Sequence, residues 1–345
     1  MPRTPLSPEN AIKLWHAREE NVLAPYAARS ASATRPRPED ETPPRPAYQE
    51  DHYRIVRTRA FRRLAHKTQA LSAMKGDHRR TRLTHTLEVS LIAGTLARIW
   101  SLNEDLTAAI AMGHDLGHAP FGHAGERMLD KLVPGGFNHH EQSLRVADLL
   151  ADNGKGLNLT LWTRDGILKH SKGLGPVFAP DPERHPGTGE GMTVRVSDIV
   201  AYLAHDMDDA MEAGILTVRE IPVRILRVFG DSPESRENAM LRDLVENTEI
   251  TPEGLKFSFS PGMEENMETL REFLLAKVYR DSAIMSDMTE GAMAVKRIYE
   301  RIMADDELFE TLPLRHLASD RAEAVKDFIA GMTDNFCFDY LEKLR

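Results

Sequence analysis

The chain has 345 residues, enough for two domains or for one large helical domain with appended segments. Its 44 Lys and Arg against 53 Asp and Glu give a formal charge of -9, which excludes a cationic surface over the whole protein. The one cysteine, Cys337, can form neither an internal disulfide nor a cysteine zinc site. Without a signal-like start or a long apolar stretch, we expect a cytoplasmic protein that does not contact a membrane.

The first 50 residues predict a helix followed by an irregular segment. Apolar residues recur at helical spacing over 11–28, which indicates a short helix that packs on the main body. Residues 36–46 carry five prolines and several charges, a composition that cannot form a packed core. We therefore predict an exposed loop there, within a first unit that spans residues 1–50.

Residues 51–150 show a helical pattern, with apolar side chains three and four positions apart. Pro120 and the glycines around it interrupt this pattern, which predicts a helix end, a turn and a new helix near residue 125. A further helix is expected over 139–151. Residues 171–192 are rich in Gly and Pro and too long for a plain connection, so we predict a mobile loop there.

The rest of the chain also has a helical pattern, beginning with residues 194–213, so the predicted fold class is mainly α with little β. Residues 249–260 and 221–229 are modest strand candidates. We expect residues 51–214 to form a helical core around a metal site. Residues 215–345 are expected to add helices that wrap this core and build an oligomer interface.

Histidines are concentrated in one part of the chain: His78, His85, His114, His118, His123, His139 and His140. Imidazole and carboxylate are the usual ligands of a divalent metal where thiolates are absent. His114 and Asp115 adjoin at a helix end, so both can bind one ion only if other helices supply the remaining ligands. His85, and Asp198 or Asp206, are the candidates. Such a nitrogen and oxygen ligand set favours Mn, Mg, Fe, Co or Ni over structural zinc.

A cationic stretch precedes and overlaps this region and contains Arg54, Arg57, Arg59, Arg62, Arg63, Lys67, Lys75, Arg79, Arg80 and Arg82. A run of charges is usually a solvated face, but a triphosphate carries close to four negative charges and Arg binds phosphate bidentately. Arg82 is the best phosphate-binding candidate, because it lies three residues before His85 and so on the same helix face. The other basic residues could serve a regulatory nucleotide site, single-stranded nucleic acid or a subunit interface.

Six strings occur in order between residues 48 and 214: AFRRLAHKTQAL, RTRLTHTLEVS, GHDLGHAPFGHAGE, FNHHEQSLRV, GILKHS and SDIVAYLAHDMDDA. With His85, the His114–Asp115 doublet and a distant Asp, they resemble the deoxyguanosine triphosphate triphosphohydrolase-like branch of the HD-domain metal phosphohydrolases. The resemblance implies metal-dependent hydrolysis of deoxynucleoside triphosphates (dNTPs) to deoxynucleoside and tripolyphosphate. It also implies a homo-oligomer, as a hexamer or tetramer, and an activating dNTP in some relatives.

The resemblance places the metal ligands on His85, His114, Asp115 and Asp198, the last because it lies four residues before Tyr202. The list of implied substrate-binding residues is Arg82, Gln69, His139, Tyr202 and Asp206, with Gln69 at the sugar or base edge and Tyr202 and Asp206 at the deoxyribose. Asp208 and Asp209, by contrast, are interpreted as a solvated acidic face.

The implied catalytic residues are His123, Glu126 and His118, of which His118 contacts phosphate in relatives. His123 and Glu126 are three residues apart at a helix start, so we expect the carboxylate to hold the imidazole in orientation. His140 stands where relatives usually have Asn, which leaves open whether His139 or His140 enters the site.

Two alternatives stay open at this point. Other HD-type enzymes cleave cyclic nucleotides, nucleoside monophosphates or alarmones, although the strings around HAPFGHAGE argue against these branches. The second alternative is a catalytically silent sensor that binds nucleotides or nucleic acid and has kept only the metal site.

Overall fold

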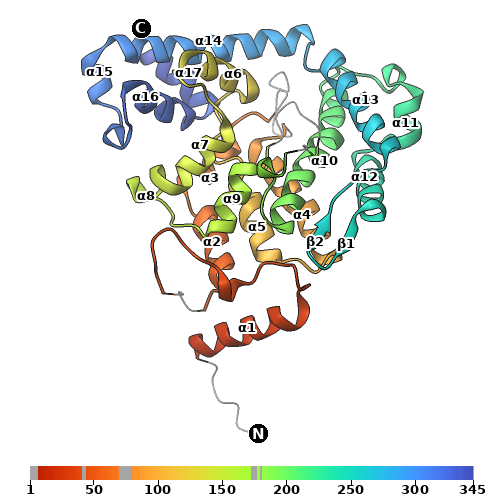
Figure 1. The fold of residues 1–345 in the computed structure, drawn as a ribbon. Coiled ribbons are helices and arrows are strands. Elements are labelled where there is room, and N and C mark those ends of the chain that lie inside the picture. The colour runs from red at the N-terminus through yellow and green to blue at the C-terminus, as the bar shows by residue number, and fades with distance from the viewer. Residues whose placement is uncertain (1–6, 41–43, 70–78, 172–176, 179–180, 345) are drawn as a thin grey trace.

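The computed structural model describes residues 7–40, 44–69, 79–171, 177–178 and 181–344. These residues form helices and one short hairpin (Figure 1). The first helices are α1 (Pro8–Val22), α2 (Ala47–Val56), α3 (Arg59–Arg63), α4 (Arg82–Ile99), α5 (Glu104–Gly113), α6 (Gly122–Leu132), α7 (His139–Arg145), α8 (Ala151–Gly154) and α9 (Leu161–Lys169). The later elements are α10 (Gly189–Glu212), α11 (Val223–Phe229), α12 (Pro233–Asn247), β1 (Glu249–Thr251), β2 (Gly254–Lys256), α13 (Pro261–Lys277), α14 (Ser282–Ala304), α15 (Asp306–Glu310), α16 (Arg321–Ala330) and α17 (Asp334–Lys343).

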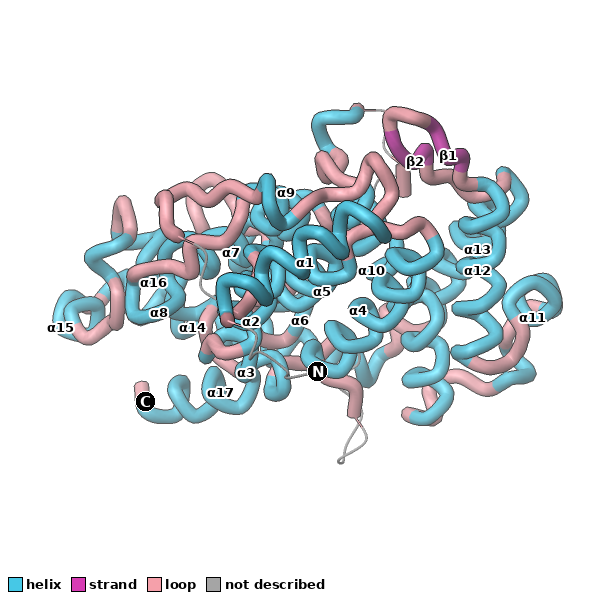
Figure 2. Tube along the Cα trace, turned by 90° about the horizontal axis from the view of Figure 1, so that it is seen from below, coloured by secondary structure: helices cyan, strands magenta, loops and turns pink. Residues whose placement is uncertain are grey.

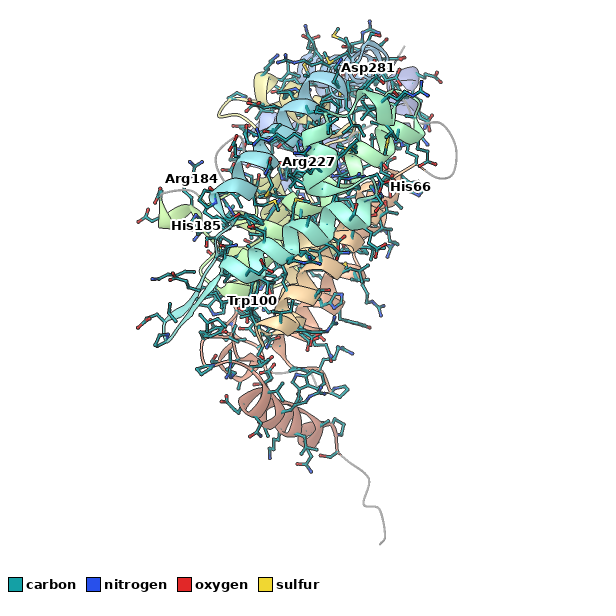
Figure 3. The ribbon with its side chains drawn as sticks, turned by 90° about the vertical axis from the view of Figure 1, so that its right-hand side faces the viewer. His66, Trp100, Arg184, His185, Arg227 and Asp281 are labelled. Carbon is teal, nitrogen blue, oxygen red and sulfur yellow. The ribbon has the colours of Figure 1, made fainter. Side chains whose placement is uncertain are left out.

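The centre of the molecule is a bundle of α2, α4, α5, α9 and α10. Helix α4 begins at a capping box, in which the hydroxyls of Thr81 and Thr84 accept hydrogen bonds from each other's backbone N–H. Its inner face buries Val89, Ile92 and Leu96. Trp100, labelled in Figure 3, follows the last turn of α4 and is also buried. Three- and four-residue spacings thus direct one stripe of α4 into the core, but Leu87 and Leu91, which belong to the predicted apolar pattern, are exposed.

A second core lies at the C-terminal end of the fold. There α14 packs against α6, α16 and α17 (Figure 1), and the buried side chains include Phe121, Leu129, Ile298, Ile329 and Cys337. Figure 2 shows the β1–β2 hairpin on the other side of the molecule from α15 and α16. Among the described residues, no helix is long and apolar enough to cross a lipid bilayer.

The mainly α fold class is confirmed, with differences at element boundaries. Helix α1 begins earlier than expected, because Ser7 caps it and Pro8 occupies its first turn, and it ends at Val22 instead of residue 28. Residues 36–40 are exposed and belong to no helix or strand, as predicted. Of the expected 171–192 loop, the part from Gly189 onward belongs to α10, whose N-cap is Thr188. Part of that loop, residues 172–176 and 179–180, lies outside the described residues.

One strand candidate is correct in part and the other is wrong. Residues 249–256 form an antiparallel hairpin in which Ile250 is paired with Leu255. The segment 221–229 is instead mostly helix α11, and Ile225 and Phe229 are its buried residues. These two side chains lie four positions apart on one helix face, where they pack into the main core. Burial of this stripe therefore overrides the β propensity of the valines and isoleucine around it.

Candidate metal and nucleotide site

The four side chains that the resemblance assigns to a metal come together inside the helical bundle. His85 lies in the first turns of α4, while His114 and Asp115 directly follow α5. One ligand atom from each of these three buried residues lies within 4.8 Å of the others. Asp198 reaches the same place from α10, with its Oδ1 3.0 Å from Nε2 of His85. Three separate segments therefore bring together nitrogen and oxygen atoms that could hold one metal ion.

The hydrogen bonds of the two imidazoles fit a divalent metal. Nδ1 of His114 lies 2.6 Å from the carbonyl of Ala111, so it carries the proton and leaves the Nε2 lone pair free. That Nε2 is buried and has no hydrogen-bond partner among the described residues. Nδ1 of His85 is likewise occupied, 3.0 Å from Nε2 of His205. Metal-binding histidines usually commit their other nitrogen in this way. A buried lone pair without a partner is unfavourable, and a metal ion would satisfy it.

The carboxylates of the set are held in the ionised form that metal binding needs. Burial by itself would raise the pKa of Asp198, but the hydrogen bond and charge of His85 hold this pKa well below its usual range. The pKa of Asp115 is also low despite burial, because the guanidinium of Arg82 and the imidazole of His114 stabilise its charge. Both groups therefore carry negative charge at neutral pH.

Arg82 faces the metal ligands instead of solvent. Its Nη1 lies 2.7 Å from Oδ2 of Asp115, and its Nη2 donates a hydrogen bond to the backbone carbonyl of Gln69, at 3.2 Å. Arg82 is only 2% exposed, and Gln69 is also buried, with no partner for its Oε1 within the described part of the chain. The predicted phosphate ligand and the predicted sugar or base ligand thus lie side by side next to Asp115.

A second group of histidines lies beside the metal ligands. The carboxylate of Glu126 accepts hydrogen bonds from the backbone N–H of His139 at 2.9 Å and from its Nδ1 at 2.8 Å. The ring of His139 stacks on that of His118, with the centroids 4.9 Å apart. Among the described residues no hydrogen bond joins Glu126 to His123, and the hydrogen bonds of Glu126 go to His139 instead. The side-chain ligand atoms of His118, His123 and Glu126 nevertheless lie within 4.8 Å of one another.

The reason for this pairing is the turn that precedes α7. This turn brings His139 next to α6. On that helix Glu126 is half-buried, while His123 is exposed to solvent. The structure also shows that His139, and not His140, contacts Glu126 and His118. Burial would lower the pKa of His139, but the charge and hydrogen bond of Glu126 raise it. Burial and the charge of Arg82 keep the pKa of His118 well below its usual range.

Tyr202 and Asp206 lie on one face of α10, as expected from their spacing of four residues. Asp206 is buried, and its Oδ2 accepts a hydrogen bond from the hydroxyl of Tyr279. The prediction of a solvated acidic face is wrong for Asp209, which is buried and forms an ion pair with Arg80. Helix α10 buries residues all round, and this ion pair offsets the cost of burying the carboxylate.

The sequence interpretation missed several residues that line the site. His170 is buried, with Nδ1 2.8 Å from the carbonyl of Ile167 and Nε2 3.2 Å from Nε2 of His139. The string GILKHS contained this residue, but nothing in its spacing indicated a contact with His139. His205 supports His85, and Tyr279 reaches Asp206 from beyond α13.

Most of the cationic stretch lies elsewhere. A cavity of about 1140 Å³ is lined by basic side chains that include Arg54, Arg57, Arg59, Arg62, Arg63 and Lys155. Arg79, Arg80 and Arg82 are not among its lining residues, and each of these three has a carboxylate partner. Lys75 lies outside the described residues. The predicted basic patch is therefore divided between the metal site and this separate cavity.

Lys67 lies under the turn that carries His118. Its ammonium donates hydrogen bonds to the backbone carbonyls of His118 and Ala330, and burial together with the charge of Arg63 lowers its pKa to about 7. In the unfolded chain a Lys has a pKa of about 10.4, so the unfolded state binds more protons between these two pKa values. The free energy of unfolding should therefore rise with pH above about 7, by up to about 1.4 kcal/mol per pH unit from this group.

Urea unfolding of the wild type and of Lys67→Met, at several pH values from about 7 to 9.5, measures this contribution. The difference in free energy of unfolding, wild type minus variant, should increase with pH because the Met side chain does not titrate. A difference that stays constant over this range would show that Lys67 keeps an ordinary pKa.

Comparisons with known proteins agree with this geometry. Residues 82–208 match the HD domain, and residues 257–343 match the phosphohydrolase-associated domain. The deoxyguanosinetriphosphate triphosphohydrolase-like protein of Desulfatibacillum aliphaticivorans is 42% identical over 338 residues, which cover 96% of both chains. The protein of the same name from Caldanaerobacter subterraneus subsp. tengcongensis is 44% identical over 321 residues, which cover 92% of this chain and 91% of that protein. The chain therefore belongs to the deoxyguanosinetriphosphate triphosphohydrolase-like family of HD-domain phosphohydrolases.

Proposed function

We propose that this protein hydrolyses dNTPs to deoxynucleoside and tripolyphosphate, using a divalent metal held by His85, His114, Asp115 and Asp198. The observation that carries the proposal is the buried group of His85, His114 and Asp115, in which Nε2 of His114 has no hydrogen-bond partner among the described residues. HD domains bind divalent metals, and the name of the relatives supports a nucleotide triphosphate as substrate. Mn, Mg, Co, Fe and Ni all suit such a ligand set.

In this mechanism the residues of the chain position the triphosphate and move one proton. When bound, the metal supplies Lewis acidity toward a phosphate oxygen and lowers the pKa of a water. Arg82 and the neutral imidazole of His118 would donate hydrogen bonds to phosphate oxygens, since phosphoryl transfer is promoted mainly by positioning and neutralisation of charge. His123 would protonate the 5′-oxygen as it leaves. The Glu126–His139 pair lies next to His123. The Glu126 carboxylate would stabilise the positive charge of the imidazole that donates the proton.

The product analysis is the direct test of this proposal. The purified protein would be incubated with the four dNTPs and the four ribonucleotides, singly and in mixtures, with Mn, Mg or Co. Chromatography and phosphorus NMR would identify the products. Deoxynucleoside with intact tripolyphosphate is the expected result, and turnover only in mixtures would indicate an activating dNTP. Deoxynucleoside monophosphate with pyrophosphate would contradict the proposal and favour another HD-type phosphohydrolase.

If the protein hydrolyses no nucleotide in any of these conditions, the result would favour the alternative of a catalytically silent sensor. Oligonucleotide binding that weakens steeply with salt would then indicate single-stranded nucleic acid as its ligand. Light scattering after size-exclusion chromatography tests the proposed homo-oligomer, for which a hexamer or a tetramer is expected. These measurements separate the catalytic proposal from the oligomer proposal, because neither outcome depends on the other.

Discrimination against ribonucleotides is proposed to depend on Tyr202, which lies one helical turn after Asp198 and is partly buried. If its ring packs against C2′, Tyr202→Ala should reduce the ratio of kcat/KM for dGTP over GTP by about tenfold or more, as expected for a lost steric contact. Tyr202→Phe keeps the ring and is the matched control, which should retain the wild-type ratio. Equal hydrolysis of GTP and dGTP by the wild type would remove Tyr202 from this role.

A further inference from the structure

One carboxylate from the C-terminal helices binds two separate segments of the site. Asp334, at the start of α17, is 6% exposed. Its Oδ1 accepts a hydrogen bond from the backbone N–H of Phe121 at 2.9 Å. Its Oδ2 accepts from the backbone N–H of Thr68 at 2.9 Å and from the Thr68 hydroxyl at 2.5 Å. Each carboxylate oxygen thus accepts hydrogen bonds from one of the two segments. Nη2 of Arg79 makes a further, longer contact with Oδ2, at 3.3 Å.

The two segments that Asp334 binds through Thr68 and Phe121 both carry residues of the proposed site. Thr68 precedes Gln69, the predicted sugar or base ligand. Phe121 is the N-cap of α6, the helix that presents His123 and Glu126. Phe121 has a left-handed backbone with φ of 60°, an unfavourable conformation for an aromatic residue, and no side chain caps this helix start. The surrounding structure must therefore hold this turn in place.

Further contacts from the C-terminal helices hold the same turn. The ring of Phe121 packs against that of Phe338 on α17, with the centroids 4.9 Å apart. On the other side of the turn, Lys67 joins the carbonyl of His118 to that of Ala330 at the end of α16. Helix α17 thus holds the end of this turn that begins α6. The end of α16 holds the His118 end through Lys67. Figure 1 shows these helices beside α6.

We propose that Asp334 is a positioning residue: by binding Phe121 and Thr68 together, it fixes the turn that carries His118, His123 and Glu126 relative to Gln69. Among the described residues, the hydrogen bonds of Asp334 go to Phe121, Thr68 and Arg79 and none reaches the metal ligands or these catalytic candidates, so Asp334 acts through the segments it binds. The C-terminal region is therefore required for the geometry of the site. The inference rests on the proposed function for its kinetic consequence, but its structural part can be tested without any substrate.

Asp334→Asn is the direct variant, because the amide keeps the shape of the side chain and places an NH₂ group where one oxygen accepted a bond. Either Phe121 or Thr68 then loses its acceptor. Turnover should fall by about 10- to 100-fold, as expected when catalytic groups are displaced by a fraction of an ångström to 1 Å. Asp339→Asn removes the same charge from an exposed position on α17 and should retain wild-type turnover.

Two readouts separate positioning from a general structural role. Metal affinity, measured by calorimetry with Mn, should stay near that of the wild type, well short of the roughly 10- to 100-fold loss that follows damage to the support of a metal ligand. Amide hydrogen exchange should accelerate at residues 116–124 in Asp334→Asn but not in Asp339→Asn, while exchange in α10 stays unchanged. The exchange experiment needs no turnover, so it still tests the inference if the protein proves inactive toward dNTPs.

Thr68→Val removes the hydroxyl contact with Asp334 without changing the side-chain volume, and Thr68→Ser restores the hydroxyl. We expect a smaller loss of turnover in Thr68→Val, with recovery in Thr68→Ser, which also covers the case in which Asp334→Asn fails to fold. Wild-type turnover and wild-type exchange at residues 116–124 in Asp334→Asn would overturn the inference. So would a uniform acceleration of exchange across the whole protein, since that would indicate a loss of global stability.

Discussion

Replacing His123 with Ala should lower kcat by about 10²- to 10⁴-fold, the contribution typical of a positioned general acid. His123 is exposed at the first turn of α6, so its removal should leave the fold and the metal ligands unchanged. The measurement is steady-state kinetics with a dNTP that the wild type hydrolyses, together with the melting temperature and metal content of the variant. Retained metal and a retained melting temperature would locate the loss in the proton transfer.

Two other histidine variants decide how such a result is interpreted. His66 is exposed, and its side chain forms no hydrogen bond, ion pair or ring contact with the other described residues, so His66→Ala should behave as the wild type. His139→Ala removes the imidazole that Glu126 binds and whose pKa Glu126 raises. Near wild-type turnover in His123→Ala, with a large loss in His139→Ala, would transfer the role of proton donor to His139.

The second large effect is expected at the metal. His114→Ala removes the imidazole whose buried Nε2 has no hydrogen-bond partner in the parts of the chain that the structure describes, so metal affinity should fall by more than the roughly 10- to 100-fold that loss of an outer-sphere partner costs. Turnover should fall to the background rate, because neither Lewis acidity nor an activated water is then available. Calorimetry with Mn and metal analysis after dialysis measure the loss directly.

His170→Ala is the matched control for this experiment. His170 is buried beside His114, with ring centroids 4.9 Å apart, yet its nitrogens face the carbonyl of Ile167 and the imidazole of His139. We therefore expect His170→Ala to retain most of the metal. An equal loss of metal in both variants would contradict the proposed ligand set and would place His170 among the ligands.

Local sequence signals predicted much of this fold, and the resemblance to a known family supplied the candidate metal ligands. Helix α4, the end of α5 and the start of α6 follow from periodicity, capping residues and glycines, which act over a few residues. The four candidate metal ligands come from α4, the end of α5 and α10, and they meet in space because these helices pack together. The family membership also follows from strings that can be read without a structure.

Other features were decided only when distant segments packed together. Glu126 pairs with His139 because the turn before α7 crosses α6, a geometry that the three-residue spacing to His123 cannot reveal. Asp209 is buried because Arg80 pairs with it across the bundle.

The clearest case of such long-range dependence is Asp334, which reaches the site from more than 200 positions along the chain. Periodicity and capping report on the chemistry of adjacent residues. The partner of a buried polar group, in contrast, is selected by how helices cross and by the free-energy cost of leaving that group unpaired. The sequence, through its resemblance to a known family, thus supplied the candidate metal ligands, and the tertiary structure decided which contacts hold them in place.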